Sequence, residues 1–191
     1  MISLSKGQTI NLSKESSGLA RVMMGLGWDA VKKKGFFGFG GGSQDIDLDA
    51  SVITFDSNRQ PLDAIWFRQL KSKDGSIVHS GDNRTGDGDG DDETIRVDLA
   101  KLPAQVTDLV FVVNSFAGQN FNEVDNAVAR LVDEATGKEL ARYELREKGS
   151  HTGVVMAVVS RRSGEWTMKA VGQPAPGRTV QDLVSPAMAA L

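Results

Sequence analysis

GDNRTGDGDGDDE, residues 81–93, is the stretch around which we expect the rest of the fold to be arranged. Acidic residues make up almost half of it, and from Asp87 onward they alternate with glycine. Because such a run repels itself, it favours a bound cation, and calcium prefers several oxygen ligands of this kind. Glycine lets the backbone turn tightly, so that carbonyl oxygens can face the ion as well. The stretch therefore predicts a metal-binding loop; the alternative is a solvated acidic loop, the commoner origin of a charge run.

A second group of carboxylates lies in the clearest predicted strand, residues 45–56. Side chains alternate between the two faces of a strand, so Asp45, Asp47 and Asp49 share one face while the residues between them point to the other. Three carboxylates in a row on one face are unfavourable without a counter-charge. We interpret them as further ligands; the alternative is an outward-facing negative stripe.

Short predicted strands separated by turn signals follow one another along most of the chain. They cover residues 8–12, 19–28, 62–70, 76–80, 94–99, 109–116, 139–145, 154–160 and 165–171, and residues 126–133 are a strand or a short helix. This pattern is typical of a β-sandwich. Residues 179–191 predict a short amphipathic helix with Thr179 as its cap. The sequence thus predicts one mainly β domain over residues 1–191, a sandwich of two sheets with long calcium-binding loops and a short C-terminal helix.

Residues 35–44 are rich in glycine and phenylalanine and predict a flexible surface loop next to the basic residues 32–34. The segment has no lysine followed by serine or threonine after its last glycine, so it is not a phosphate-binding loop. An alternative is that Phe36, Phe37 and Phe39 are exposed there for contact with a partner or an anionic membrane.

Composition excludes several classes of function. The 191 residues suit one domain, and their net charge of -3 indicates no basic surface for nucleic acid. The absence of cysteine excludes disulfides and thiolate metal sites, and only two histidines argue against a zinc site. The N-terminus has no apolar run after a basic start, and no window approaches a transmembrane segment. We therefore expect a soluble, intracellular protein.

The acidic stretch fits neither of two well-known calcium motifs. In an EF-hand register that begins at Asp87, the sixth position is Asp92 where glycine is required, and the flanks are predicted strands. A β-roll needs several copies of its glycine–aspartate repeat, and this chain has one. The remaining interpretation is a site built from more than one loop of the sandwich. Because calcium takes about six to eight oxygens, the two acidic groups exceed the needs of one ion and predict two adjacent ions.

Four motifs together resemble the TerD-domain family of tellurite-resistance and stress proteins. They are KSKDGSIVHSGDNRTGDGDGDDE at residues 71–93, DIDLDAS at 45–51, GLGWD at 25–29 and GEW at 164–166. The beginning, ISLSKGQT at 2–9, and the end, GRTVQDL at 177–183, are most similar to the TerZ branch of that family. The similarity covers nearly the whole chain, and the long acidic motif is specific.

The resemblance implies a bacterial calcium-binding protein of the cytoplasm, without established enzymatic activity, that acts in resistance to tellurite and other stresses. Its calcium ligands would come from the two acidic motifs, with Asp29 as a weaker addition: Asp29, Asp45, Asp47, Asp49, Asp82, Asn83, Asp87, Gly88, Asp89, Gly90, Asp91, Asp92 and Glu93. The protein would be a sensor or scaffold for other stress-resistance proteins at the inner membrane surface.

Two alternatives to this function stay open. One is a peripheral membrane module in which calcium bridges acidic loops to lipid phosphates. The other is a two-metal hydrolase. The adjacent His79 and Ser80 do not support it, because neighbouring strand residues point to opposite faces and cannot form a catalytic pair.

Overall fold

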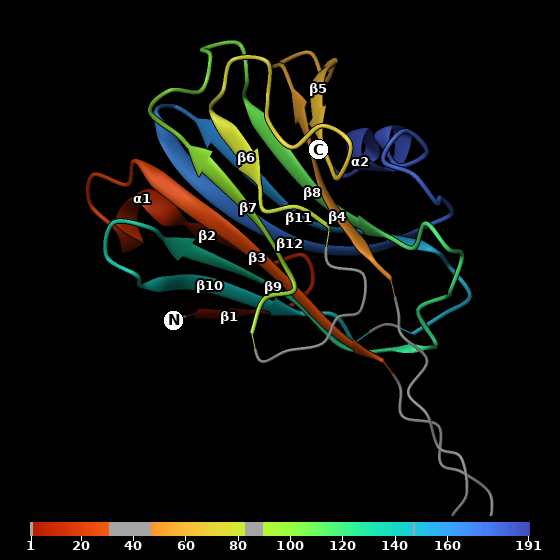
Figure 1. Ribbon diagram of the computed structural model, residues 1–191. Coiled ribbons are helices and arrows are strands. Elements are labelled where there is room, and N and C mark those ends of the chain that lie inside the picture. Colours follow the sequence, from red (N-terminus) through yellow and green to blue (C-terminus); the bar gives the residue numbers. More distant parts are fainter. Residues whose placement is uncertain (1, 31–46, 83–89, 147) are drawn as a thin grey trace, which may run out of the picture.

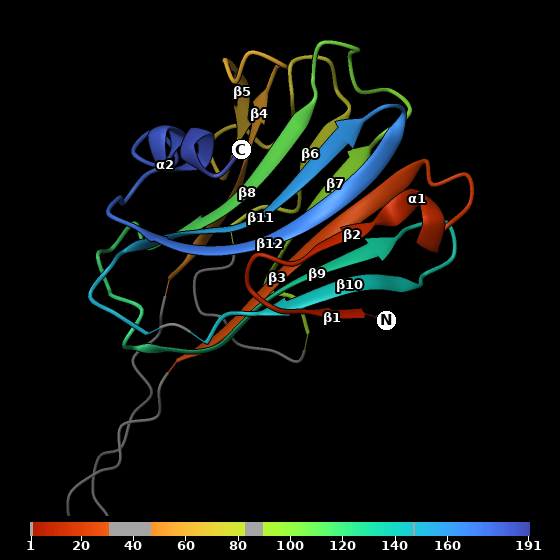
Figure 2. The ribbon, with the colours of Figure 1, turned by 180° about the vertical axis from the view of Figure 1, so that it is seen from behind.

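The computed structural model describes residues 2–30, 47–82, 90–146 and 148–191, and its strands form a sandwich of two sheets (Figure 1). Sheet A contains, in spatial order, β1 (Ile2–Leu4), β10 (Glu139–Glu144), β9 (Val124–Asp133), β3 (Arg21–Ala30), β7 (Glu93–Asp98) and β6 (Ile77–His79). Sheet B contains β2 (Thr9–Asn11), β12 (Glu165–Ala175), β11 (Gly153–Arg162), β8 (Asp108–Asn114), β4 (Asp49–Phe55) and β5 (Pro61–Ile65). Figure 2 shows the long strands β11 and β12 crossing the back of the molecule. The predicted mainly β sandwich is confirmed.

The main hydrophobic core lies between the two sheets, where facing strands contribute alternate side chains. Leu26 of β3, Phe111 of β8 and Met156 of β11 are almost completely buried there. Strands β4 and β8 are buried at every residue, because a second apolar cluster covers the outer face of sheet B. That cluster includes α2 (Val184–Ala189). Burial on both faces explains why the predicted strand over residues 109–116 is a continuous apolar run.

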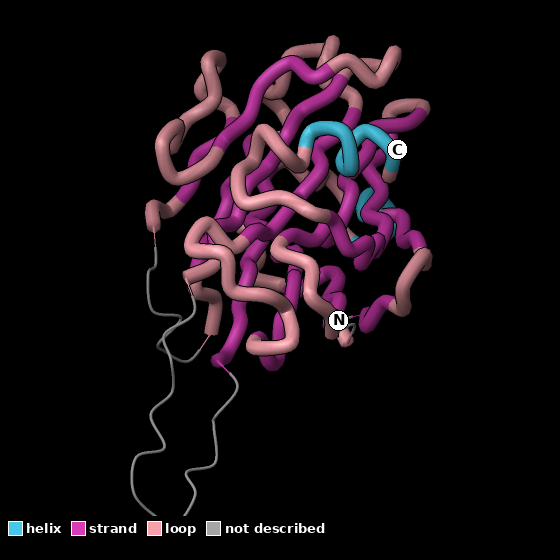
Figure 3. Tube along the Cα trace, turned by 90° about the vertical axis from the view of Figure 1, so that its right-hand side faces the viewer, coloured by secondary structure: helices cyan, strands magenta, loops and turns pink. Residues whose placement is uncertain are grey.

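The described part of the chain contains two short helices, seen against the strands in Figure 3. Helix α1 (Leu12–Glu15) was not predicted, and it is capped by the side chain of Asn11. Helix α2 confirms the predicted C-terminal helix, but its predicted start is wrong. The Asp182 carboxylate accepts hydrogen bonds from the backbone N–H and the hydroxyl of Thr179, which closes a turn before the helix begins. No helix among these residues has the length and apolar character needed to span a membrane.

Several strand boundaries differ from the predicted ones. The strand predicted over residues 62–70 ends at Ile65, because Trp66 and Gln69 exchange backbone hydrogen bonds of 3.1 and 2.9 Å across a tight turn. The strand predicted from residue 45 begins at Asp49. The ambiguous segment over residues 126–133 lies in strand β9.

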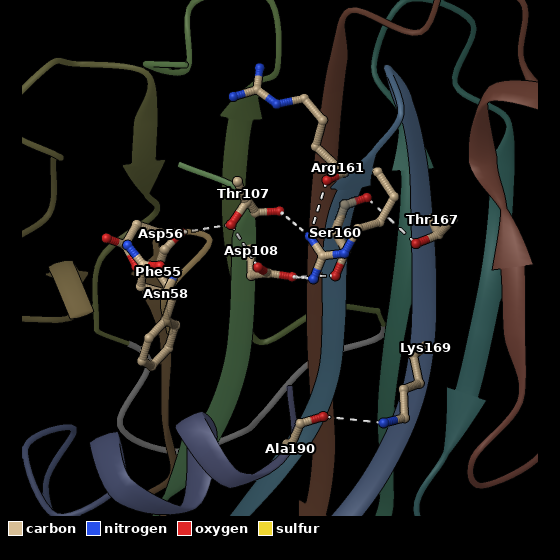
Figure 4. A network of polar contacts seen from close by, with 11 residues as sticks. Phe55, Asp56, Asn58, Thr107, Asp108, Ser160, Arg161, Thr167, Lys169 and Ala190 are labelled. Carbon is tan, nitrogen blue, oxygen red and sulfur yellow. Dashed lines mark hydrogen bonds and ion pairs between the residues drawn. The ribbon is translucent and has the colours of Figure 1, made fainter. Parts of the chain in front are cut away.

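A polar network fixes the end of sheet B at which β8 begins (Figure 4). The buried carboxylate of Asp108 accepts hydrogen bonds from the Thr107 hydroxyl at 2.8 Å and the Ser160 hydroxyl at 2.5 Å. Arg162 forms an ion pair with it at 2.6 Å. At the opposite end of β8, Asn114 is paired with Asp49, the first residue of β4.

Candidate metal centre

Three carboxylates from the two acidic motifs meet at one end of the sandwich. Asp49 is the first residue of β4, Asp47 lies just before it, and Asp82 follows β6. One oxygen atom of each lies within 4.8 Å of the other two, and this is the one such group of three among the described residues. The structure thus brings the two motifs together, while the role of these residues as ligands stays a prediction.

Asp49 has a strongly perturbed pKa. Its side chain is buried, and the residue is 3% exposed. Burial, followed by the negative charges of Glu93, Asp47 and Asp82, raises the pKa of Asp49 from 3.8 to about 7. At neutral pH, ionisation of the Asp49 carboxyl is therefore opposed by its burial and by the neighbouring negative charges. A bound cation would offset both effects.

Asn114 lies beside Asp49 and was missed by the sequence analysis. The two residues are paired in the register of β4 and β8, and the Asn114 amide N–H donates to the Asp49 carboxylate at 3.4 Å. The same amide donates to the Arg178 carbonyl at 2.8 Å, whereas its buried Oδ1 has no hydrogen-bond partner among the described residues. A buried carbonyl oxygen without a partner is uncommon in proteins and is a suitable additional donor for a hard cation.

Glu93 and His79 form a buried latch between the two sheets. The Glu93 carboxylate accepts a hydrogen bond from the Ala50 N–H at 2.8 Å and lies 3.4 Å from Nε2 of His79. Nε2 of His79 also lies 2.9 Å from the Ala50 carbonyl, and Nδ1 accepts a hydrogen bond from the Gly81 N–H at 3.0 Å. Nδ1 therefore carries no proton, and Nε2 is the donor. The latch fixes Gly81, and with it Asp82, relative to β4.

Asp91 lies apart from the group of three and pairs with Arg130 of β9. Nε of Arg130 is 2.6 Å from Oδ1 of Asp91, and Nη2 of Arg130 is 2.7 Å from Oδ2. The Asp91 carboxylate lies directly over Gly25, in the space that a β-carbon at that position would occupy. This pair anchors the end of the acidic segment on sheet A.

Asp92 and Asp29 form a smaller acidic group next to β3. Asp92 accepts a hydrogen bond from the Trp28 N–H at 2.8 Å, and Asp29 accepts one from the Asn126 amide at 2.7 Å. Burial raises the pKa of Asp92 and the Trp28 hydrogen bond lowers it, but the charges of Asp29, Glu93 and Asp91 add to the rise, so the net shift is upward. The two residues are thus close enough to repel each other.

The glycines of the GLGWD motif allow the acidic segment to approach β3. A β-carbon on Gly27 would lie 2.8 Å from the Gly90 carbonyl oxygen, which is closer than real atoms approach. The Asp92 N–H donates to the Leu26 carbonyl at 2.9 Å, so the segment is bound to this strand. Glycine within a strand predicts such an approach, and the structure confirms it here.

Several predicted ligands lie outside the described residues: Asp45, Asn83, Asp87, Gly88 and Asp89. The predicted Gly/Phe loop over residues 35–44 and its basic neighbours at 32–34 also lie outside them. Gly90 is described and has a φ of 118°, a conformation that favours glycine. The full ligand set and the expectation of two ions stay predictions.

Comparison with known proteins gives consistent matches over the whole chain. Residues 1–185 match the profile of the TerD domain. Tellurium resistance protein TerZ of Serratia marcescens is 55% identical over 192 residues, which cover 100% of this chain and 99% of that protein. Tellurium resistance protein TerD of the same organism is 42% identical over 180 residues and 90% of each chain. Stress response protein SCP2 of Bacillus subtilis is 41% identical over 194 residues, covering 96% and 98%.

A solved structure supports the fold independently. The crystal structure of a homologue of telluride resistance protein (TerD) from Streptomyces coelicolor A3(2) has a TM-score of 0.69 to this chain, covering 87% of this chain and 96% of that one. At 21% sequence identity the likeness shows the sandwich fold alone.

Proposed function

The chain belongs to the TerD-domain family, whose relatives are named tellurium resistance and stress response proteins, and we propose that it acts there by binding calcium. In this proposal the protein is a sensor or scaffold in the cytoplasm, and it carries out no catalysis. The observation that carries the proposal is the buried, charge-strained Asp49 with the oxygens of Asp47 and Asp82 within 4.8 Å.

The donor set suits calcium in its chemistry. Three carboxylate oxygens within 4.8 Å of one another can face a single ion, and calcium binds about six to eight oxygen ligands in a flexible geometry, whereas magnesium demands a strict octahedron and keeps several of its waters. Every donor is a carboxylate oxygen, and the Asn114 carbonyl oxygen is available beside them. A second ion near Asp29 and Asp92 is part of the proposal, because the mutual repulsion of these two residues favours a cation.

The chain's own residues couple such a site to the rest of the fold. Asn114 connects Asp49 to the Arg178 carbonyl and thus to the segment that leads into α2. Glu93 and His79 connect β7 and β6 to Ala50 of β4. Calcium binds the folded site and not the unfolded chain, so it stabilises the fold and draws these segments together. This coupling is what a sensor or scaffold requires.

The geometry gives no support to His79 as a catalytic base. Its Nδ1 accepts from the Gly81 N–H and its Nε2 lies within hydrogen-bond distance of the Ala50 carbonyl, so both ring nitrogens are engaged inside the protein. The relatives compared above are likewise named for resistance or stress response. We therefore favour binding over hydrolysis.

Calorimetric titration of chelator-treated protein with calcium tests the proposal. Wild type is compared with Asp49→Asn and Asp82→Asn, and with Glu165→Gln as the control, because Glu165 is an exposed carboxylate at the start of β12, at the opposite end of sheet B from Asp49. We expect the two site variants to lose at least about tenfold in affinity, the order expected when a ligand or its immediate neighbour is lost. The control should titrate like wild type.

Two outcomes would contradict the proposal. One is the absence of both heat and a thermal shift for wild type at millimolar calcium. The other is an equal loss of affinity in Glu165→Gln, which would indicate a general effect of charge. Two more variants, titrated in the same way, extend the test. Asp47→Asn changes the third member of the group of three, and Asp89→Asn changes a predicted ligand that lies outside the described residues.

A further inference from the structure

Exposed apolar side chains gather around one turn of the molecule, residues 66–71. Four large apolar side chains are exposed in the described part of the chain: Leu70, Val78, Phe116 and Met188, at 39–44%. Leu70 belongs to this turn, Val78 pairs with Lys71, and the Phe116 ring packs against Phe67 at 5.9 Å. A concentration of this kind on a small domain indicates a contact surface.

An arginine lies at the centre of the same surface. The guanidinium carbon of Arg68 is 5.3 Å from the centroid of the Phe67 ring, 5.7 Å from that of Trp66 and 5.7 Å from that of Phe116. Arg68 is exposed and forms no ion pair with the carboxylates that the structure describes. The three rings therefore hold a charged group at the surface while leaving it available to an external anion.

Two further cations follow Arg68 in the chain. Lys71 and Lys73 are both exposed, and the side chain of Lys73 is 77% exposed even though it lies 3.9 Å from Asp63. We call Trp66, Phe67, Arg68, Leu70, Lys71 and Phe116 the Arg68 patch. Apolar rings interleaved with cations complement a surface that is apolar inside and anionic outside, which is the chemistry of a membrane with acidic phospholipids.

The Arg68 patch directly adjoins the candidate metal centre. Phe116 lies two residues after Asn114, which contacts Asp49. On the other side of the patch, the His79 N–H donates to the Leu70 carbonyl at 2.9 Å, and His79 belongs to the latch that fixes Asp82. A cation bound at the carboxylates would therefore lie beside the aromatic rings and add positive charge to the same surface.

We propose that the Arg68 patch docks onto an anionic phospholipid membrane, with calcium at the adjacent carboxylates as a second contact to lipid phosphate. The calcium contact rests on the function proposed above, whereas the apolar and cationic contacts do not. The rings enter the interfacial layer, Arg68 and Lys71 pair with phosphate oxygens, and calcium cancels the acidic charge that would otherwise repel the membrane.

Vesicle sedimentation of the full chain tests this docking. Vesicles of phosphatidylcholine are compared with vesicles that also contain phosphatidylglycerol, each with calcium or with chelator. Arg68→Gln is matched by Arg146→Gln, whose guanidinium is exposed on the sheet A side beside β10, and Phe116→Ser is matched by Met188→Ser on α2. Every variant is also titrated with calcium by calorimetry.

We expect wild type to sediment with the anionic vesicles in calcium and to stay in solution with the neutral ones. Arg68→Gln should weaken binding about fivefold, the effect of one cation near an anionic surface. Phe116→Ser should weaken it as well, and both variants should bind calcium normally. Neither control should change vesicle binding.

The outcomes separate the two proposals. Normal calcium binding without sedimentation would overturn the membrane as the occupant and leave the metal site intact. Controls that weaken binding as much as the patch variants would also overturn it. If wild type binds no calcium, the function proposed above fails, and vesicle sedimentation in chelator then tests the Arg68 patch alone. Vesicle binding by wild type that is lost in Arg68→Gln would support the patch as a membrane contact. No vesicle binding by wild type would overturn the membrane proposal.

Discussion

Arg130 and Asp91 form a two-point ion pair, at 2.6 and 2.7 Å, that ties the end of the acidic segment to the middle of β9. The pair passes over Gly25, so the segment just before β7 contacts both β3 and β9 at this point. The hydrogen bonds that Arg130 donates to Asp91 raise the pKa of Arg130 above its ordinary value, so the guanidinium stays charged at any physiological pH. This end of the segment is therefore anchored whether or not a metal is bound.

Replacing Arg130 with methionine should lower the free energy of unfolding by about 2 kcal/mol, because Asp91 is left mostly buried without its counter-charge. The measurement is urea denaturation. Arg96→Met is the control, since Arg96 pairs with Glu134 at the solvent-exposed surface and should contribute about 0–1 kcal/mol. Equal losses in the two variants would show that the Asp91 pair is no more than a surface ion pair.

Alanine at Gly25 and at Gly27 should destabilise the protein for different reasons. At Gly25 the β-carbon displaces the Asp91 side chain and breaks its ion pair, whereas at Gly27 it meets the Gly90 backbone carbonyl at 2.8 Å. Each should cost about 1–3 kcal/mol, the range for overpacking. In the Arg130→Met background the Gly25→Ala effect should shrink and the Gly27→Ala effect should persist. A double-mutant cycle by urea denaturation measures this, and additivity at both positions would contradict it.

Metal-free protein should lose stability as the pH rises from about 4 to about 7. The pKa of Asp49 is about 7 in the folded state against an ordinary 3.8, so across this window the folded state keeps a proton that the unfolded chain has released. The stability that this proton supports falls with rising pH, levels off above about 7, and amounts to about 4 kcal/mol at most.

Thermal unfolding in chelator at several pH values checks this expectation. Asp49→Asn should flatten the pH dependence and be more stable than wild type at pH 8 without metal, yet gain less from added calcium. Proton competition should also weaken calcium binding by wild type at pH 6 relative to pH 8. If the thermal stability of wild type and of Asp49→Asn were the same at every pH, the buried Asp49 carboxyl would not be the cause of the pH dependence.

The latch of His79 and Glu93 should be necessary for both stability and metal affinity. His79→Phe removes the acceptor for the partly buried Gly81 N–H and the partner of the buried Ala50 carbonyl, and should cost about 2–4 kcal/mol. Hydrogen exchange should show faster exchange of the Gly81 amide in the variant. Calcium affinity should fall too, because Asp82 follows Gly81. Unchanged exchange at Gly81 would mean that the latch does not position this residue.

Much of the site could be predicted from local sequence pattern. Alternation along a strand predicts Asp47 and Asp49 on one side; Asp47 lies just before β4 and not in it, yet the structure brings both within reach of Asp82. Glycine at positions 25 and 27 predicts a close approach without saying which segment approaches. These signals depend on a few neighbouring residues, so one sequence is enough to read them.

Other parts of the site depend on contacts between distant residues. His79 becomes important only because β6 lies opposite Ala50 of the other sheet, and no local pattern carries that information. Asn114 is one polar residue at the end of an apolar run, and its contact with Asp49 follows from the β4–β8 register. Strand β1 has three residues, too few for a periodic signal, and it forms because β10 is available to pair with it.

The placement of β1 and β2 has a consequence for how the chain folds during synthesis. These two strands supply an edge to each sheet, and their partners β10 and β12 are among the last strands to be made. Residues 2–11 therefore leave the ribosome before their partner strands exist, and the sandwich closes only after β12 has been made. A deletion of residues 2–11 would open one edge on each sheet at once and expose both to pairing with neighbouring chains.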